Sequence, residues 1–338
     1  MSQTDRLSLP FENGQIAVPD VGPILALRAQ PCPAYDRFPR DRFVVVQTHF
    51  PTFDALGRAG FNTSMDTPPL YSLALVHLTR SRDENRANIA SAYSALEQGG
   101  TLVVDGAKTD GIESLLKAVK KLLPVGGAIS KAHGKVFWLT KAETPAEFSL
   151  WIKALTPSQN AAGYWTKAGV FSEDKIDKGS LELVPFLAGK LKGAGADLGA
   201  GWGFLAKEAL ATNPDITALD LIEADRGALE CAKLNVTFER AQFSWGDVTD
   251  LHTGRHPKNA LDFVISNPPF HQSRKADPAL GQRFIESAAK LLKPNGVLYL
   301  VANRQLAYEA TLDASFRHVE RLSQNSQFKC FFARKPKL

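Results

Sequence analysis

Short apolar runs and longer amphipathic stretches alternate along most of the chain, a pattern typical of strands followed by helices. In the first half, β-branched runs predict buried strands, and apolar residues at helical spacing predict helices between them. Gly99-Gly100 is expected to end the first of these helices. The predicted strands are 42–47, 71–78, 101–104 and 136–139, and the predicted helices are 83–96 and 112–123.

The second half continues this alternation and predicts a parallel, doubly wound sheet. Between the halves, a polar stretch with Pro145 and Pro157 interrupts the pattern and indicates a domain boundary. We therefore expect an α/β protein of two tandem Rossmann-like domains, 1–150 and 151–338. In the second half, the predicted strands are 196–198, 218–222, 263–265 and 297–301, and the predicted helices are 181–191, 204–212, 226–235 and 281–292.

The two halves share an internal pattern. Leu96–Val104, which follows a predicted helix, resembles Leu292–Leu300, and a strand-type run precedes each helix. The first half is therefore predicted to be a second copy of the same unit. We expect this copy to be degenerate, because His77–Ser81 stands where the second half has Ser266–Phe270, and no glycine triplet follows its early strand.

The composition is that of a globular protein in a reducing compartment. The 338 residues are 44% hydrophobic and 22% charged, and the net charge is +5. This mild excess suits a polyanionic partner without requiring one. Three scattered cysteines indicate neither a disulfide framework nor a zinc site, and the pair His252 and His256 lacks a third metal ligand. We therefore expect no metal. No apolar run is long enough to span a bilayer, so we expect a cytoplasmic protein.

An amide, two prolines and an aromatic ring follow the predicted strand 263–265. Asn267 offers a side-chain carbonyl, and Pro268 offers a backbone carbonyl without an N–H that competes. Two such acceptors can bind both N–H groups of a planar amine while the ring of Phe270 stacks on its plane. The alternative is a stiff Asn-Pro-Pro turn that only closes a buried strand.

The stretch Asp197-Leu198-Gly199-Ala200-Gly201-Trp202-Gly203 lies between a predicted strand and a predicted helix. Glycines at such a turn let a ligand approach the backbone. A dinucleotide fingerprint would have G-x-G-x-x-G spacing, whereas this turn has G-x-G-x-G. The carboxylate of Asp197 would repel a pyrophosphate but attract a cationic ligand that carries an ammonium and a sulfonium group. S-adenosylmethionine is such a ligand.

Two further acids follow successive predicted strands. Glu223 is placed to accept both hydroxyls of a ribose, with Asp220 and Asp225 as competing candidates. Asp247 follows the next short strand and can accept the amino group of adenine. Singly, each acid is more often a solvated loop charge or a helix N-cap. Their order after successive strands favours one cofactor site.

With these motifs, the chain from 169 to 335 resembles a class I S-adenosylmethionine-dependent methyltransferase, and Asn267 to Phe270 marks the branch that methylates exocyclic or amide nitrogens. With the loop Phe171–Ser180 and a degenerate first half, the chain is similar to the ribosomal RNA small-subunit (16S) guanine-N2 methyltransferase family. The resemblance implies that Asn267, Pro268 and Phe270 hold the base. It implies a cofactor site made by Phe171, Asp197, Gly199, Gly201, Glu223, Asp247 and Asn267.

The function implied by this resemblance is methylation of a guanine N2 in 16S ribosomal RNA by a monomeric enzyme. Three alternatives stay open: a 23S guanine-N2 enzyme, a methyltransferase for glutamine amides in proteins, and a non-catalytic ribosome-assembly or RNA-binding factor. The first half, without a site, is expected to be an RNA-docking or folding platform. The basic residues considered for RNA contact are Arg37, Arg40, Arg42, Arg80, Arg82, Arg86, Lys117, Lys120, Lys121, Lys131, Lys135, Arg274 and Lys275.

Overall fold

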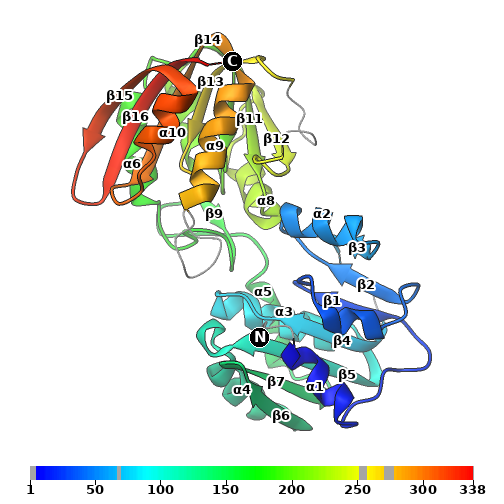
Figure 1. Ribbon diagram of the computed structural model, residues 1–338. Helices are drawn as coiled ribbons and strands as arrows, with labels where there is room; N and C mark the ends of the chain where they lie inside the picture. Colours follow the sequence, from blue (N-terminus) through cyan, green and yellow to red (C-terminus); the bar gives the residue numbers. More distant parts are fainter. Residues whose placement is uncertain (1–4, 67–69, 251–256, 270–277, 338) are drawn as a thin grey trace. The chain divides into compact units, whose positions relative to one another are not determined.

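The computed structural model describes residues 5–66, 70–250, 257–269 and 278–337. The chain forms two compact units: unit 1 is Met1–Pro157 with Lys167–Gly169, and unit 2 is Ser158–Thr166 with Val170–Leu338. In each unit, helices cover both faces of one sheet (Figure 1). None of the described helices is long and apolar enough to cross a membrane.

Unit 1 contains five α-helices and seven strands in its described part. The helices are α1 (Asp5–Glu12), α2 (Phe50–Arg58), α3 (Arg82–Ser94), α4 (Ile112–Lys120) and α5 (Glu147–Lys153), with 3-10 turns at Pro33–Arg37 and Lys108–Asp110. The strands are β1 (Ile24–Leu27), β2 (Phe43–Val46), β3 (Asn62–Ser64), β4 (Tyr71–His77), β5 (Leu96–Ala107), β6 (Gly127–Lys131) and β7 (Gly134–Thr140).

Unit 2 begins with a small hairpin, β8 (Ser158–Gln159) and β9 (Trp165–Thr166). Its described helices are α6 (Lys178–Leu183), α7 (Phe204–Thr212), α8 (Arg226–Asn235), α9 (Pro278–Leu291) and α10 (Glu309–Ser315), with a 3-10 turn at Val184–Phe186. The strands of its large sheet are β10 (Gly193–Leu198), β11 (Ile216–Glu223), β12 (Ala241–Trp245), β13 (Leu261–Ser266), β14 (Leu292–Asn303), β15 (Phe316–Gln324) and β16 (Phe328–Pro336).

The two large sheets have the same topology. Their strand orders are β3-β2-β1-β4-β5-β7-β6 and β12-β11-β10-β13-β14-β16-β15. Five strands in each sheet are parallel, and the last two add an antiparallel edge. The predicted fold class, two α/β units with mostly parallel sheets, is confirmed.

The repeat extends to an irregularity in strand pairing. Tyr71 pairs with Leu96 and Leu261 pairs with Leu292, and the register shifts directly after each of these pairs. This shared shift makes His77 equivalent to Asn267, one residue away from the alignment expected from the sequence. That alignment was wrong because it matched β4 and β13 by their apolar residues. The residues with which these strands pair on β5 and β14 define the equivalent positions.

Each sheet buries two apolar layers, as the alternation of side chains along a strand requires. In unit 2, Phe263 and Ile265 belong to the core that α6, α7 and α8 cover, whereas Val264 belongs to the core beneath α9 and α10. The central strands are therefore buried on both faces, which fixes where they end and which loops leave the sheet.

Several elements differ from the sequence predictions. The predicted helix 181–191 is wrong, since α6 ends at Leu183 and a 3-10 turn containing Pro185 follows. Pro185 has no N–H to continue an α-helix. Helix α3 ends at Ser94, ahead of Gly99, and β5 begins at Leu96. The antiparallel strands β15 and β16 were not predicted. By contrast, α7 and α8 have the predicted bounds.

Candidate functional site

The carboxyl ends of three neighbouring parallel strands form the centre of the candidate site in unit 2. Leu198 at the end of β10 pairs with Ile222 on β11 and with Ser266 on β13. The residues that follow these positions therefore leave the sheet at one edge, where ligands bind in open α/β sheets. The structure thus brings together the glycine turn, Glu223 and Asn267.

The glycine turn after β10 has a backbone that glycine favours. Gly199, Gly201 and Gly203 have φ values of 73°, 56° and 89°. A Cβ added to Gly201 would meet nothing within 4 Å, whereas one added to Gly203 would lie 2.8 Å from Val236. Gly203 is therefore required by packing of the turn on α8, and Gly201 leaves open space in which a ligand can approach the backbone.

Asp197 carries a buried carboxylate without a compensating partner. Its residue is 0% exposed, and neither carboxylate oxygen has a hydrogen bond of ordinary geometry in the described part of the chain, although the backbone N–H of Ala206 is near enough to lower the pKa. Burial, and secondarily the neighbouring charge of Glu223, raises the pKa of Asp197 to about 8. A buried ionised carboxylate is costly unless it is paired. A cationic group bound at the turn would supply the missing partner, so the residues present fit a positively charged cofactor.

Glu223 connects the end of β11 to the glycine turn. One carboxylate oxygen accepts a hydrogen bond from the backbone N–H of Gly201 at 2.7 Å, and the other accepts from that of Asp225 at 2.8 Å. Burial raises the pKa of Glu223 to about 7, while these two N–H groups act in the opposite direction. Each oxygen retains a lone pair that can accept a hydroxyl, so ribose binding by Glu223 stays a prediction.

Asp247 lies two residues after β12. Its Oδ1 accepts hydrogen bonds from the backbone N–H and the hydroxyl of Thr249, both at 2.7 Å. These bonds fix the side chain at the start of the loop, and Oδ2 keeps its capacity to accept an amino group. Recognition of adenine by Asp247 stays a prediction.

Asn267 is held by two residues that the sequence did not single out. Its Nδ2 donates to Oδ1 of Asp177 at 2.7 Å and to the hydroxyl oxygen of Ser180 at 2.9 Å. Pro268 is buried and follows directly. The predicted stacking residue, Phe270, lies outside the described residues. His252 and His256, which were considered as metal ligands, also lie outside them.

Phe171 precedes α6 and is connected to the glycine turn through its backbone. The carbonyl of Phe171 accepts a hydrogen bond from the indole N–H of Trp202 at 3.0 Å, while its ring is 62% exposed. Asn235 donates to the carbonyl of Trp202 at 2.8 Å and exchanges hydrogen bonds with the backbone of Trp165. Trp202 therefore links the turn to the Phe171 loop, and Asn235 links the turn to β9. Trp202 was noticed in the sequence without a role, and Asn235 gave no sequence signal.

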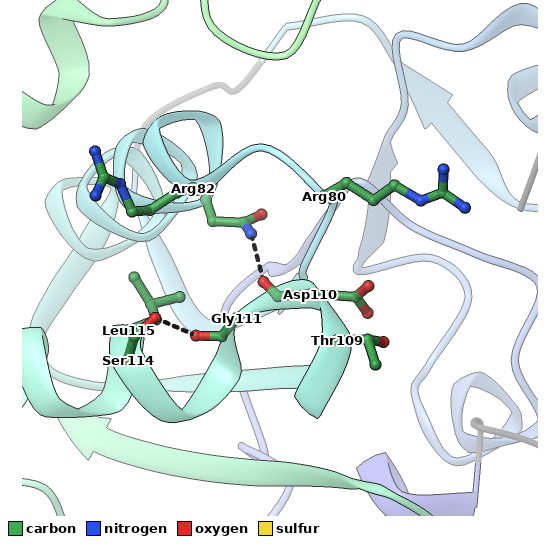
Figure 2. Close-up of a pocket in the computed structure, with 8 residues that line it drawn as sticks. Arg80, Arg82, Thr109, Asp110, Gly111, Ser114 and Leu115 are labelled. Carbon is green, nitrogen blue, oxygen red and sulfur yellow. Dashed lines mark hydrogen bonds between the residues drawn. The ribbon is translucent and has the colours of Figure 1, made fainter. Parts of the chain in front are cut away.

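Unit 1 has a separate pocket of about 150 Å³ between the ends of β4 and β5. Figure 2 shows Arg80 and Arg82 with their guanidinium groups directed away from each other. Asp110 adds a carboxylate to the lining, and Arg82 is paired with Asp83 at 3.3 Å. The pocket therefore does not direct two cations at one anion.

Some of the basic residues considered for RNA contact are engaged within unit 1. Arg37 and Arg40 pair with Glu12 and Asp36, and Arg86 pairs with Asp83. Arg80 is exposed and has no ion pair in the described part of unit 1. Arg274 and Lys275 lie outside the described residues. Across the described residues, no group of three or more His, Cys, Asp or Glu side chains could hold a metal ion.

The fold, the glycine turn and the acids after successive strands define a class of group-transfer enzymes. The chain belongs to the methyltransferase small domain family, whose model matches residues 162–331.

Two relatives share the name Ribosomal RNA small subunit methyltransferase C. The protein of Psychromonas ingrahamii is 28% identical over 267 residues, which are 77% of this chain and 74% of that protein. The protein of Shewanella loihica is 29% identical over 253 residues, which are 73% of this chain and 72% of that protein. The resemblance expected from the sequence is confirmed.

A solved structure shows the same two-unit fold. It is the T. thermophilus 16S rRNA N2 G1207 methyltransferase in complex with AdoMet and guanosine, which is 24% identical to this chain. The superposition has a TM-score of 0.79 and covers 98% of this chain and 91% of that chain.

Proposed function

We propose that this chain transfers a methyl group from S-adenosylmethionine to the exocyclic N2 of a guanine in 16S ribosomal RNA. The relatives bear the name of a small-subunit ribosomal RNA methyltransferase, and a protein with the same fold is a 16S rRNA N2 G1207 methyltransferase in complex with AdoMet and guanosine. In this chain, the proposal rests on the side-chain amide of Asn267. Its NH₂ group is bound, so its carbonyl is left to accept an amine.

Unit 2 offers a cofactor site that fits this proposal. Asp197 is buried without a partner beside the open face of Gly201, and Glu223 holds the same turn. S-adenosylmethionine, when bound, supplies a methyl group on a positively charged sulfur. Asp197 stabilises a cation at the turn, Glu223 and Asp247 offer acceptors for ribose and adenine, and Phe171 offers an exposed ring.

Asn267 and Pro268 would orient the guanine amino group. Its nitrogen is a poor nucleophile because the lone pair is delocalised into the ring. Carbonyl acceptors from Asn267 and Pro268 fix both N–H bonds and favour a lone pair that is directed at the methyl carbon. The nitrogen gains that carbon and loses one proton to water, so no strong general base is needed. Phe270 is the residue we expect to stack on the extruded base.

Unit 1 is proposed to dock the RNA. It repeats the fold of unit 2, and Arg80 leaves an exposed guanidinium without an ion pair in the described part of that unit. An unpaired arginine can bind a phosphate without losing an internal partner. We also propose that the chain is monomeric and cytoplasmic.

The function is tested with tritiated S-adenosylmethionine and separated ribosomal subunits from a strain that lacks this protein. Small subunits, large subunits, free 16S RNA and total protein are each incubated with the wild-type chain and with Asn267→Ala. We expect N2-methylguanosine in small-subunit RNA, and a loss of about a hundredfold or more in kcat for the variant.

Each other result contradicts a specific part of the proposal. Label in large-subunit RNA would identify the 23S enzyme instead. Label only in protein would favour the glutamine-amide methyltransferase. Cofactor binding without any label would favour the non-catalytic assembly factor.

A further inference from the structure

The side-chain amide of Asn267 has two chemically different ends, and only one of them suits a guanine amino group. The carbonyl end accepts hydrogen bonds, whereas the NH₂ end would oppose the N–H groups of the base. Rotation of the amide by half a turn would therefore convert an acceptor into a competing donor. Something in the chain has to select the orientation.

Asp177 makes that selection because a carboxylate can only accept hydrogen bonds. The end of Asn267 that lies 2.7 Å from Oδ1 of Asp177 must therefore be the NH₂ group. Ser180 accepts the second hydrogen of the same group through its hydroxyl oxygen, at 2.9 Å. Both donor hydrogens of Asn267 are used, and its carbonyl oxygen is the end that remains for a ligand.

The first residues of α6 hold this arrangement in place. Oδ1 of Asp177 also accepts the backbone N–H of Ser180 at 2.9 Å, which makes Asp177 the N-cap of the helix. A Cβ on the intervening Gly179 would lie 3.0 Å from the same oxygen and 3.0 Å from the ring of Phe328. Glycine at this position therefore leaves room for the carboxylate that Asn267 contacts.

We propose that Asp177, assisted by Ser180, is a positioning residue for the methyl-transfer reaction. It sets the amide of Asn267 so that the carbonyl faces the amino group of the guanine. This inference rests on the function proposed above, and it assigns to the stretch Asp177–Ser180 a role in orienting the substrate rather than in binding the cofactor.

The experiment separates positioning from helix capping by means of three substitutions at one position. Asp177→Asn keeps a side-chain oxygen that can accept from both Ser180 and Asn267. Asp177→Ser keeps an efficient N-cap, but its hydroxyl is one bond shorter and loses Asn267. Asp177→Ala loses both contacts. Ser81→Ala is the matched control, because Ser81 caps α3 in unit 1 by accepting the N–H of Glu84 at 3.3 Å.

For each chain we would measure kcat and KM with 16S RNA, the Kd of S-adenosylmethionine, and Tm. We expect Ser81→Ala to keep the wild-type kcat, and Asp177→Asn to keep most of it, because the N–H of Ser180 holds the oxygen of the new amide toward Asn267. Asp177→Ser should keep the wild-type Tm and cofactor Kd but lose about tenfold or more in kcat, because the acceptor is misoriented. Asp177→Ala should lose both kcat and Tm.

A second readout does not depend on the RNA. With ¹⁵N-labelled asparagine, the side-chain amide signal of Asn267, assigned by its absence in Asn267→Ala, should exchange slowly with water in the wild-type chain and in Asp177→Asn. In Asp177→Ser it should exchange like an exposed asparagine.

Wild-type kcat and slow amide exchange in Asp177→Ser would overturn the positioning role while the proposed function stands. A wild-type chain that methylates no RNA would instead overturn the proposed function and the guanine substrate named here. The amide exchange would then still decide whether Asp177 orients Asn267.

Discussion

Unit 1 and unit 2 have the same strand order, but the residues that end their central strands differ in charge and in bonding. Leu27 pairs with Val46 and Val76 in the way that Leu198 pairs with Ile222 and Ser266. Counted from these pairs, Ala26, Gln47 and His77 stand where unit 2 has Asp197, Glu223 and Asn267. Features that both units share are required by the fold, whereas features of unit 2 alone are those expected of a ligand site.

The turn after the first central strand keeps only its first left-handed residue in unit 1. Arg28 stands in the place of Gly199, and its φ of 53° is similar to the 73° of the glycine. The guanidinium of Arg28 is paired with Glu84 at 3.1 Å. The first left-handed residue is therefore part of the fold. The rest of the turn belongs to unit 2 alone, because Cys32, in the place of Gly203, has a φ of −147° instead of 89°.

The polar residues of unit 1 at these positions are satisfied internally. Gln47 accepts the N–H of His49 at 3.0 Å, as Glu223 accepts that of Asp225, but it donates to the carbonyl of Ala29 at 2.8 Å where Glu223 accepts an N–H of the turn. His77 is bonded to the hydroxyl of Tyr35 at 2.6 Å, and burial lowers its pKa to about 4. Unit 2 instead leaves Asp197 unpartnered, which is expected of a site that a ligand completes.

The largest expected effect comes from neutralising the two buried acids, one in each unit. Asp197→Asn should weaken binding of S-adenosylmethionine about a hundredfold or more, because the charge that compensates the cofactor is lost. Asp105→Asn should leave the paired guanidinium of Arg6 buried without its anion and cost about 3–5 kcal/mol of stability. Calorimetric titration and chemical unfolding measure the two effects. The comparison fails if Asp105→Asn abolishes cofactor binding in a chain that is still folded.

The raised pKa of Asp197 should make the stability of the folded chain depend on pH. The pKa of Asp197 in the folded chain, about 8, lies above the ordinary 3.8, so its stabilising contribution is complete below pH 3.8 and is lost as pH rises through 8. At pH 9 without cofactor, Asp197→Asn should therefore be more stable than the wild-type chain. Unfolding in urea at pH 6 and pH 9 measures this difference, and a less stable variant at pH 9 would contradict the account.

Cofactor affinity should also depend on pH. Asp197 and Glu223 must ionise to bind a cation and ribose hydroxyls, and their pKa values are about 8 and 7. The affinity for S-adenosylmethionine should therefore rise about fiftyfold between pH 6 and 7 and about tenfold between pH 7 and 8, with release of up to two protons. Titrations in buffers with different ionisation enthalpies measure the protons released. An affinity that falls over this interval would count against the role of Asp197.

A reciprocal exchange tests the equivalent positions at the ends of β2 and β11. Glu223→Gln should weaken cofactor binding about tenfold and leave most of the stability, since an amide can retain the contact with the turn. Gln47→Glu should confer no cofactor binding and should cost about 1–3 kcal/mol, because a carboxylate cannot donate to the carbonyl of Ala29. Cofactor binding in unit 1 of the Gln47→Glu chain would show that charge alone separates the units.

The smallest expected effect concerns RNA docking by unit 1. Arg80→Glu should weaken RNA binding several-fold and reduce the salt dependence of binding by about one phosphate contact, without a change in cofactor affinity. Arg58→Glu is the matched control, because Arg58 is also exposed in unit 1 but is paired with Asp54 at 2.8 Å. Filter binding at several salt concentrations measures both slopes. Equal slopes for the two variants would remove Arg80 from the docking surface.

Local patterns in the sequence predicted much of unit 2 but not the contacts between distant segments. The order of the glycine turn and the acids after successive strands predicted one site, and the structure brings the turn, Glu223 and Asn267 to one edge of the sheet. The bond from Asn267 to Asp177 spans 90 residues, so no local pattern signals it. Strand β1 has only four residues, and the amphipathic β15 shows a mixed burial pattern, so both gave weak signals.

The most direct test of the central claim is the stoichiometry of cofactor binding to the full chain by isothermal titration calorimetry, with Asp197→Asn in parallel. We expect one mole of S-adenosylmethionine per mole of wild-type chain and binding about a hundredfold weaker or more by the variant. Two moles per chain, or binding by Asp197→Asn with the wild-type affinity, would contradict the conclusion that unit 2 holds the single cofactor site.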